Sequence, residues 1–335
     1  MYIDAGQIAK KLSEVIKDKK ESGVFKEYYT KLSDKATSYG SLIKSKIPDT
    51  SIDDVKGLQE AKDLIKSFIF ISKHSDLLDY YKLNGGLGLL MYGAPGTGKT
   101  MFAEAIANAM GLPLFIVTPA DIFKSYVGAS EQAVKEIFQE IDNCKDGAIL
   151  FIDECESIFS KRDNETKDYK AAVTTELLQR MNGFGINGVK RIMIAATNRP
   201  DVIDPAYLRY KRFSHLVHIS PPDMVAKKAI IESKLKGIDL ADDITIDDIV
   251  EMTNKAAGEE TNIGYVENVL AYYSAADICG IIEETARIAM RIIEESKSEN
   301  SIPLTRTMFE KAFKKIGPSI SRQSMKFYED FNKLL

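Results

Sequence analysis

The sequence predicts an α/β protein in which helices flank a parallel sheet, followed by a smaller all-helical domain. From about residue 85 to 220, short apolar runs such as PLFIVTP and AILFID alternate with stretches of helical periodicity, which is typical of strands buried on both faces. Beyond PPD at 221–223, apolar residues recur only at helical spacing. With 335 residues and 44% hydrophobic composition, the chain is long enough for two domains.

The N-terminal segment, residues 1–47, is predicted to be a short helical region. Its apolar residues recur at helical spacing and indicate two or three amphipathic helices: Ile8, Leu12, Val15 and Ile16, then Phe25, Tyr28, Tyr29 and Leu32. The stretch KIPDTSIDD breaks this pattern at Pro48 and marks a boundary. We therefore predict three parts: residues 1–47, an α/β domain at 48–220 and a helical lid domain at 221–335.

The stretch GAPGTGKT at 93–100 lies between the predicted strand LGLLMY and the predicted helix KTMFAEAIANAM. It fits the pattern GxxxxGK[ST] in the context that a phosphate-binding loop requires. Glycines there let backbone N–H groups face an anion, and the helix N-terminus adds positive potential. Lys99 is expected to reach the β- and γ-phosphates, and Thr100 to bind Mg²⁺. The expected nucleotide-binding residues of this loop are Gly93, Pro95, Gly96, Thr97, Gly98, Lys99 and Thr100.

Two adjacent carboxylates, Asp153 and Glu154, end the apolar strand AILFI about fifty residues further on. We expect Asp153 to hold Mg²⁺ and to contribute to nucleotide binding, while Glu154 polarises the water that attacks the γ-phosphate. This division of roles favours hydrolysis over transfer to a bound acceptor. Acidic residues at a helix N-terminus are the alternative interpretation.

A third strand, RIMIAATNRP, ends at Asn198, and DPAYLRYKRF follows with Arg209 and Arg212. The Asn198 amide is placed to hydrogen-bond the attacking water or the γ-phosphate, although asparagine is also an ordinary turn residue. The two arginines fit either a solvated face or fingers that reach a nucleotide held by a neighbouring subunit.

These motifs together resemble those of the AAA ATPases in the narrow sense, over about residues 50–335. GAPGTGKT resembles the family's Walker A motif and FIDE its Walker B motif. ATNRPDVIDPAYLRYKRF resembles the second region of homology, and SAAD the sensor-2 region, in which Ala275 is expected near the nucleotide. FEKAFKKIGPSISRQSMKFYEDF is similar to the terminal helices of katanin and spastin.

The resemblance implies a P-loop NTPase fold with one AAA module, in a ring that is normally a hexamer with ATP between subunits. In such a ring a polypeptide is pulled through the central pore. The family's pore loop is an aromatic, an aliphatic and a glycine, which are Tyr126, Val127 and Gly128 here. An aromatic face contacts many different side chains, as a non-specific puller must. Packing of Tyr126 in the core is the alternative.

The sequence departs from the family's pattern at several positions. Lys211 stands where glycine is usual and Ser214 where aspartate is usual, so the arginine loop is expected to differ in shape from the family's loop. Ala275 and Lys56 also replace usual glycines, the latter near the adenine position. The segment 253–271 is longer than the family's connection, and either lengthens a helix pair or binds a partner. The charged run at 161–170 is either a solvated loop or a second pore loop.

Composition restricts the compartment and the partners. The formal net charge is −4, from 45 basic and 49 acidic residues, so no global attraction to nucleic acid or to an anionic membrane is expected. The cysteines, Cys144, Cys155 and Cys279, form no CxxC pair and suit a reducing compartment. No apolar run approaches the roughly 18 residues of a spanning helix, and the charged N-terminus does not resemble a signal peptide. A cytoplasmic protein without a transmembrane segment is expected.

The sequence thus predicts an Mg²⁺-dependent ATPase that binds ATP and ADP, assembles as a homo-oligomer and remodels, disassembles or unfolds an unidentified protein substrate. The N-terminal helices are expected to act as an adaptor or substrate module. Two alternatives use the same ATP site. One is a nucleotide-gated scaffold without threading, and the other is a nucleic-acid remodeller, against which the aromatic pore loop and the negative net charge argue.

Overall fold

The computed structural model describes the chain from residue 45 onward, with gaps. The described ranges are 45–74, 80–81, 87–123, 129–144, 146–160, 168–182, 191–209, 212–255, 271–297 and 300–333. The predicted N-terminal helices lie outside these ranges, as do Tyr126, Val127 and Gly128 and most of the charged run at 161–170. The predictions for these residues stay predictions.

A parallel sheet forms the centre of the α/β part and confirms the predicted fold class. Its strands lie side by side in the order β3-β4-β5-β2-β6, and every neighbouring pair is parallel. In chain order they are β2 (Leu87–Tyr92), β3 (Leu114–Val117), β4 (Ala148–Ile152), β5 (Arg191–Thr197) and β6 (Phe213–His218). The described chain opens with the short strand β1 (Ser45–Lys46).

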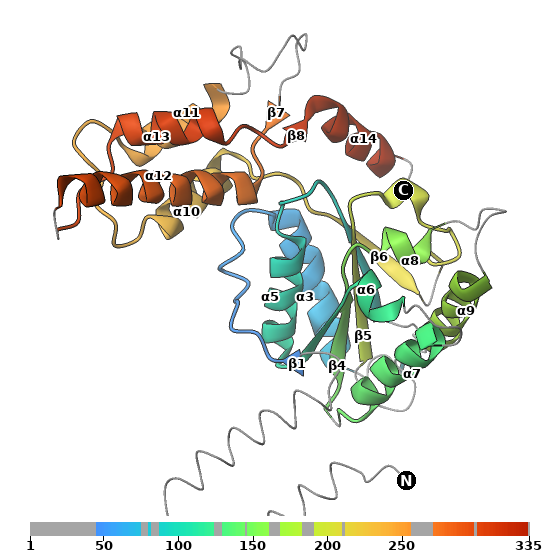
Figure 1. Cartoon of the computed structure of the whole chain (residues 1–335). Coiled ribbons are helices and arrows are strands. Elements are labelled where there is room, and N and C mark those ends of the chain that lie inside the picture. The colour runs from blue at the N-terminus through green and yellow to red at the C-terminus, as the bar shows by residue number, and fades with distance from the viewer. Residues whose placement is uncertain are drawn as a thin grey trace, which may run out of the picture. The chain divides into compact units, whose positions relative to one another are not determined.

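Helices cover both faces of this sheet, with α3 and α5 on one side and α7 and α9 on the other (Figure 1). The longer helices are α3 (Gln59–Lys73), α5 (Lys99–Met110), α7 (Ala129–Asp142) and α9 (Asp168–Asn182). Short turns at strand ends are α6 (Pro119–Ile122), α8 (Glu156–Phe159) and the 3₁₀ turn η1 (Pro200–Val202). All five residues of β4 are buried, which explains why that strand reads as a continuous apolar run rather than an alternating one.

A helical region follows the sheet, as predicted, and has its own buried core, but it is not all-helical, because it also holds a short antiparallel strand pair. Phe309 and Ile281 are fully enclosed there with Tyr273 and Ile249. Its elements are α10 (Met224–Lys234), α11 (Ile246–Lys255), α12 (Ala275–Ser296) and α13 (Arg306–Lys315), then the antiparallel pair β7 (Ala271–Tyr272) and β8 (Ile320–Ser321), and α14 (Arg322–Lys333). The apolar residues that recur at helical spacing in this region therefore form the faces along which its helices pack.

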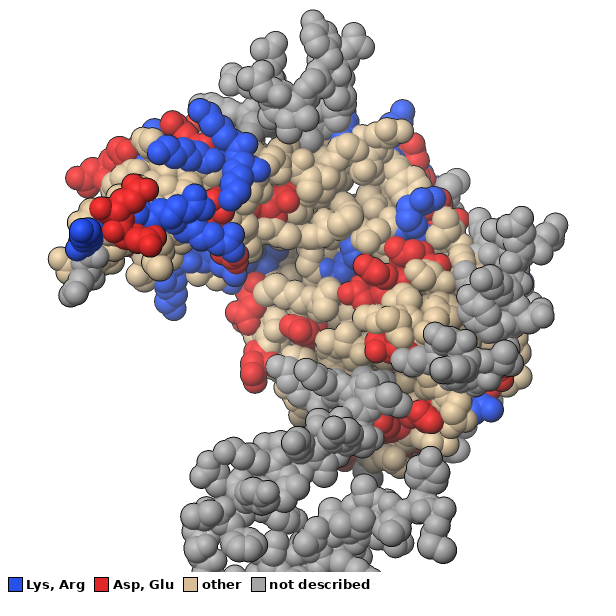
Figure 2. Space-filling model, in the orientation of Figure 1, with Lys and Arg blue, Asp and Glu red and all other residues tan. Residues whose placement is uncertain are grey.

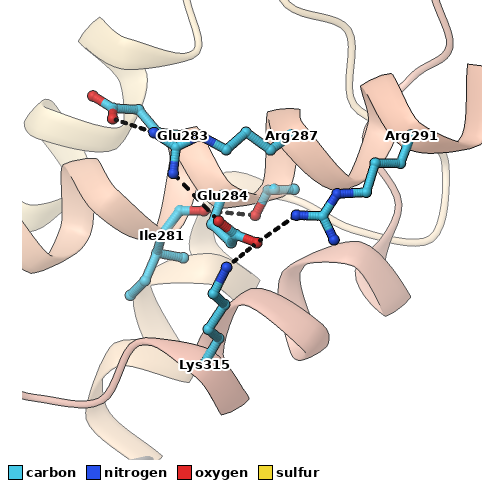
Figure 3. A network of polar contacts seen from close by, with 7 residues as sticks. Ile281, Glu283, Glu284, Arg287, Arg291 and Lys315 are labelled. Carbon is cyan, nitrogen blue, oxygen red and sulfur yellow. Dashed lines mark hydrogen bonds and ion pairs between the residues drawn. The ribbon is translucent and has the colours of Figure 1, made fainter. Parts of the chain in front are cut away.

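A buried carboxylate joins α12 to α13 in this region. Glu284 is only 3% exposed, accepts hydrogen bonds from Lys315 Nζ at 2.8 Å and Arg287 at 3.4 Å, and forms an ion pair with Arg291 at 3.6 Å (Figure 3). The hydrogen bond from Lys315, with the charge of the neighbouring cations, lowers the pKa of Glu284 below its usual value. Lys and Arg side chains gather over these helices in Figure 2. Arg287 also pairs with the exposed Glu283 at 3.8 Å, and acidic side chains lie among the basic ones on this surface in Figure 2.

Candidate nucleotide-binding site

The loop GAPGTGKT connects β2 to α5, as the sequence predicts. Gly93 adopts φ 154°, and a Cβ built on it would lie 2.2 Å from the carbonyl oxygen of Ile219, so only glycine fits this close approach of two backbones. Gly98 adopts φ 99° immediately before α5. Thr97 closes the loop on itself, because its hydroxyl donates to the Ala94 carbonyl at 2.9 Å. These features of the chain itself fix the shape of the loop backbone.

Lys99, the first residue of α5, is buried and fully engaged in hydrogen bonds. Its ammonium group donates to the carbonyl oxygens of Gly93 at 3.0 Å and Ala94 at 2.8 Å, and to Asn198 Oδ1 at 2.8 Å. Burial lowers the pKa of Lys99 to about 8, although the carboxylates of Asp153 and Glu156 oppose the shift. A polyanionic ligand in this loop would supply negative charge next to the Lys99 ammonium and so stabilise its protonated form.

Thr100 and Asp153 come together from α5 and the end of β4. The Thr100 hydroxyl donates to Asp153 Oδ2 at 3.1 Å, and Asp153 Oδ1 accepts from the backbone N–H of Glu154 at 2.9 Å. One hydroxyl and one carboxylate side by side fit Mg²⁺, which takes a few protein oxygens and completes its shell with water and phosphate. The described residues hold no group of three or more metal-ligating His, Cys, Asp or Glu side chains.

Glu154 is the second residue after β4, and it is exposed. Its φ is 49°, a left-handed conformation that is unusual for glutamate. Strained backbone of this kind concentrates at functional sites, where it directs a side chain. The following N–H, that of Cys155, donates to the Ala196 carbonyl at 2.9 Å and fixes the turn against β5.

Asn198 follows β5, which lies between β4 and β2 in the sheet. The register pairs Thr197 with Tyr92, and Ala195 with Ile152. The carboxyl ends of three adjacent strands therefore carry the loop before Lys99, the pair Asp153 and Glu154, and Asn198. Motifs about fifty residues apart in the sequence meet because the strands are parallel and neighbouring.

The helical region also reaches the loop, through the start of α12. The backbone N–H of Ala276 donates to the Gly96 carbonyl at 3.1 Å, and a Cβ built on Gly96 would lie 2.8 Å from Ser274 Oγ. Sequence reasoning named Ala275 in this segment but missed Ser274 and Ala276 as the residues in contact. The sequence SAAD does indicate where α12 begins, because Ser274 and Asp277 form a capping box that fixes its first turn, but it does not indicate that this turn contacts Gly96.

The predicted arginine fingers lie on the loop before β6. Arg209 is exposed, whereas Arg212 is half-buried and donates to the Ala206 carbonyl of the same loop. Lys211 lies outside the described ranges, and the Ser214 hydroxyl is 3.1 Å from His215 Nδ1. The other departure, Lys56, donates to the Asp53 carbonyl at 2.7 Å.

Comparison with known proteins identifies a family over the α/β part. The family described as "ATPase family associated with various cellular activities (AAA)" matches residues 89–221. A cell division cycle protein 48 homolog of Archaeoglobus fulgidus is 34% identical over an alignment of 294 residues that covers 84% of this chain and 37% of the relative. Protein SAV of Sulfolobus acidocaldarius is 33% identical over 289 residues, 82% of this chain and 35% of the relative.

An ATP-dependent zinc metalloprotease FtsH of Caulobacter vibrioides is 31% identical over 290 residues, 85% of this chain and 42% of the relative. The chain thus spans less than half the length of these relatives. The likeness of the C-terminal segment to katanin and spastin stays a prediction. No helix in the described ranges combines the length and the apolarity needed to cross a lipid bilayer.

Proposed function

This chain belongs to the AAA family of ATPases, and from that premise we propose that it hydrolyses ATP to ADP and phosphate with Mg²⁺ and uses the energy to remodel protein substrates. The observation that carries the proposal is the convergence of Lys99, Asp153 and Asn198 at three neighbouring strand ends. A loop shaped for phosphate, a magnesium-type oxygen pair and a polar amide are the parts that phosphoryl transfer to water needs.

The proposed roles follow from position and chemistry. Lys99 and Thr100 bind the phosphates and Mg²⁺, with backbone N–H groups from Gly93 to Gly98 around the phosphates. Asp153 holds the metal, and Mg²⁺ neutralises charge on the phosphates when it is bound. Glu154, exposed at the strand end, orients and polarises the attacking water. Asn198 reports the γ-phosphate, because the amide oxygen that now accepts from Lys99 lies beside the phosphate loop.

Contact between subunits is proposed to complete this site. Arg209 and Arg212 would act in trans on the nucleotide of a neighbouring copy, in a ring that is a hexamer. The exposure of Arg209 supports a role outside its own subunit. The proposed compartment is cytoplasmic, with no nucleic-acid partner.

Protein is the proposed substrate class. One relative is by its name an ATP-dependent metalloprotease, and therefore acts on polypeptide in an ATP-dependent manner. Polypeptide would be gripped by Tyr126, Val127 and Gly128, the segment between α6 and α7. An aromatic grip is sequence-tolerant, because its apolar face contacts side chains of many kinds.

The test is ATP-driven unfolding of a stably folded fluorescent protein that carries an unstructured tag. Tyr126→Ala is expected to keep ATP turnover and lose unfolding, whereas Tyr126→Phe, which preserves the aromatic ring, keeps both. Unfolding by Tyr126→Ala at the wild-type rate would contradict the role of Tyr126. A wild type that turns over ATP but never unfolds the tagged substrate would favour the nucleotide-gated scaffold.

A further inference from the structure

The last helix, α14, lays one face on the same edge of the sheet that carries the nucleotide site. Tyr328 is 4% exposed and packs in a buried cluster with Tyr92, Ala94 and Ile320. Further apolar side chains border this cluster: Leu216, Met325, Phe327 and Phe331. The apolar positions of α14 recur three residues apart, which is the spacing of one helical face. The helix therefore has a defined docking face rather than a frayed end.

Polar contacts from this face reach the ends of three neighbouring strands. The Tyr328 hydroxyl donates to the backbone carbonyl of Asn198 at 2.8 Å, just beyond β5. Asn332 Oδ1 accepts from the hydroxyl of Tyr92, the last residue of β2. Asn332 Nδ2 lies 3.4 Å from Nδ1 of His218, the last residue of β6. One helix more than a hundred residues away in sequence thus joins β2, β5 and β6 at their carboxyl ends.

The strand-end residues Asn198 and Tyr92 connect α14 to the nucleotide site. Asn198 accepts at its carbonyl from Tyr328 and at its side chain from Lys99, both at 2.8 Å. Tyr92 immediately precedes Gly93, and its ring stacks on His218 at 5.3 Å with an interplanar angle of 22°. A loop residue held on two sides has little freedom to rotate, and small displacements of a catalytic group cost large factors in rate.

We propose that α14 positions the nucleotide site and that Tyr328 acts through Asn198 as a positioning residue. Tyr328 touches the backbone of Asn198 and no reacting atom, so its effect falls on turnover rather than on nucleotide affinity. The Asn332 contacts hold the start of the phosphate loop in the same way. This inference rests on the proposed ATP hydrolysis. It adds that α14, the last helix in the described part of the chain, influences the turnover rate by positioning residues of the site.

The experiment compares Tyr328→Phe in the full chain with Tyr81→Phe, the same chemical change at an exposed tyrosine. Loss of one neutral hydrogen bond is expected to lower kcat about 2- to 10-fold, with KM within about twofold of wild type. Backbone amide exchange at 197–199 is expected to quicken in Tyr328→Phe only. Tyr81→Phe is expected to match wild type in all three measurements.

The role of Asn198 is isolated by combining Tyr328→Phe with Asn198→Ala. If Tyr328 acts through the Asn198 side chain, the double variant is no slower than Asn198→Ala alone. Wild-type kcat in Tyr328→Phe, multiplicative losses in the double variant, or a loss confined to KM would each overturn the positioning role while leaving ATP hydrolysis intact. A wild type that hydrolyses no ATP would overturn the proposed function, and this inference with it.

Discussion

The buried ammonium of Lys99 predicts that nucleotide binding takes up a proton. In the free protein, burial lowers the pKa of Lys99 to about 8. Phosphates beside the ammonium favour its charged form and raise that pKa. The sign follows from linkage: the bound state holds the proton more tightly, so affinity is at its maximum below pH 8 and falls as the pH rises through 8.

The magnitude follows from the same pKa. At pH 8 about half of the free molecules lack the proton, so binding should take up about 0.5 proton per site. Between pH 7 and pH 9 the affinity should fall about tenfold, which corresponds to about 1.4 kcal/mol. The terminal phosphate of ADP, with a second pKa of about 6, is largely ionised over this range, so Lys99 dominates the change in affinity.

Calorimetric titration with ADP in buffers of different ionisation enthalpy measures both quantities. Lys99→Arg is the matched control, because a guanidinium keeps its proton throughout this range. That variant is expected to bind more weakly, because its geometry differs, but without proton uptake and with affinity independent of pH. Wild-type affinity that is flat from pH 7 to 9, or an equal pH dependence in Lys99→Arg, would refute the reasoning.

The remaining predictions concern Glu154, the proposed general base, and the stability of the helical region that follows the sheet. Glu154→Gln should bind ATP as wild type does and lose turnover by about 10²- to 10⁴-fold, measured by phosphate release; near-normal release would remove Glu154 as the base. Glu284→Gln should lower the melting temperature at pH 7, whereas Glu283→Gln, at a carboxylate 60% exposed, should not. Because the pKa of Glu284 is lowered on folding, its contribution to stability starts to fall below the ordinary glutamate pKa of about 4.3 and is lost as pH falls through the folded pKa. The difference in melting temperature between wild type and Glu284→Gln should therefore narrow with falling pH, and a difference that stays constant down to pH 3 would contradict this.

The parallel sheet and the phosphate loop could be predicted from sequence because local patterns fix both. Continuous apolar runs such as AILFI, each ending in polar residues, indicate strands buried on both faces with functional groups at their carboxyl ends. Sequence patterns placed Lys99 and Asn198 near the carboxyl ends of strands, but the hydrogen bond between their side chains was not predicted. The order of the strands came only with the structure.

The contacts made by the helical region could not be predicted, because they join residues with no local signal. Tyr328 lies in a stretch that reads as one amphipathic helix among several, and nothing in that pattern names Asn198, 130 residues earlier, as its partner. Similarly, the capping box at Ser274 indicates where α12 begins but not that its first turn meets Gly96. Such contacts depend on how one helical surface docks on a sheet edge.

ATP turnover per subunit against protein concentration, for wild type and Arg212→Ala, tests the central claim most directly, with the mass of the assembled species determined at each point. The account predicts a steep rise in turnover as the assembly forms, and its loss in Arg212→Ala even where the assembly persists. Turnover independent of both concentration and Arg212 would mean that each subunit is a self-sufficient ATPase, and would contradict a ring motor.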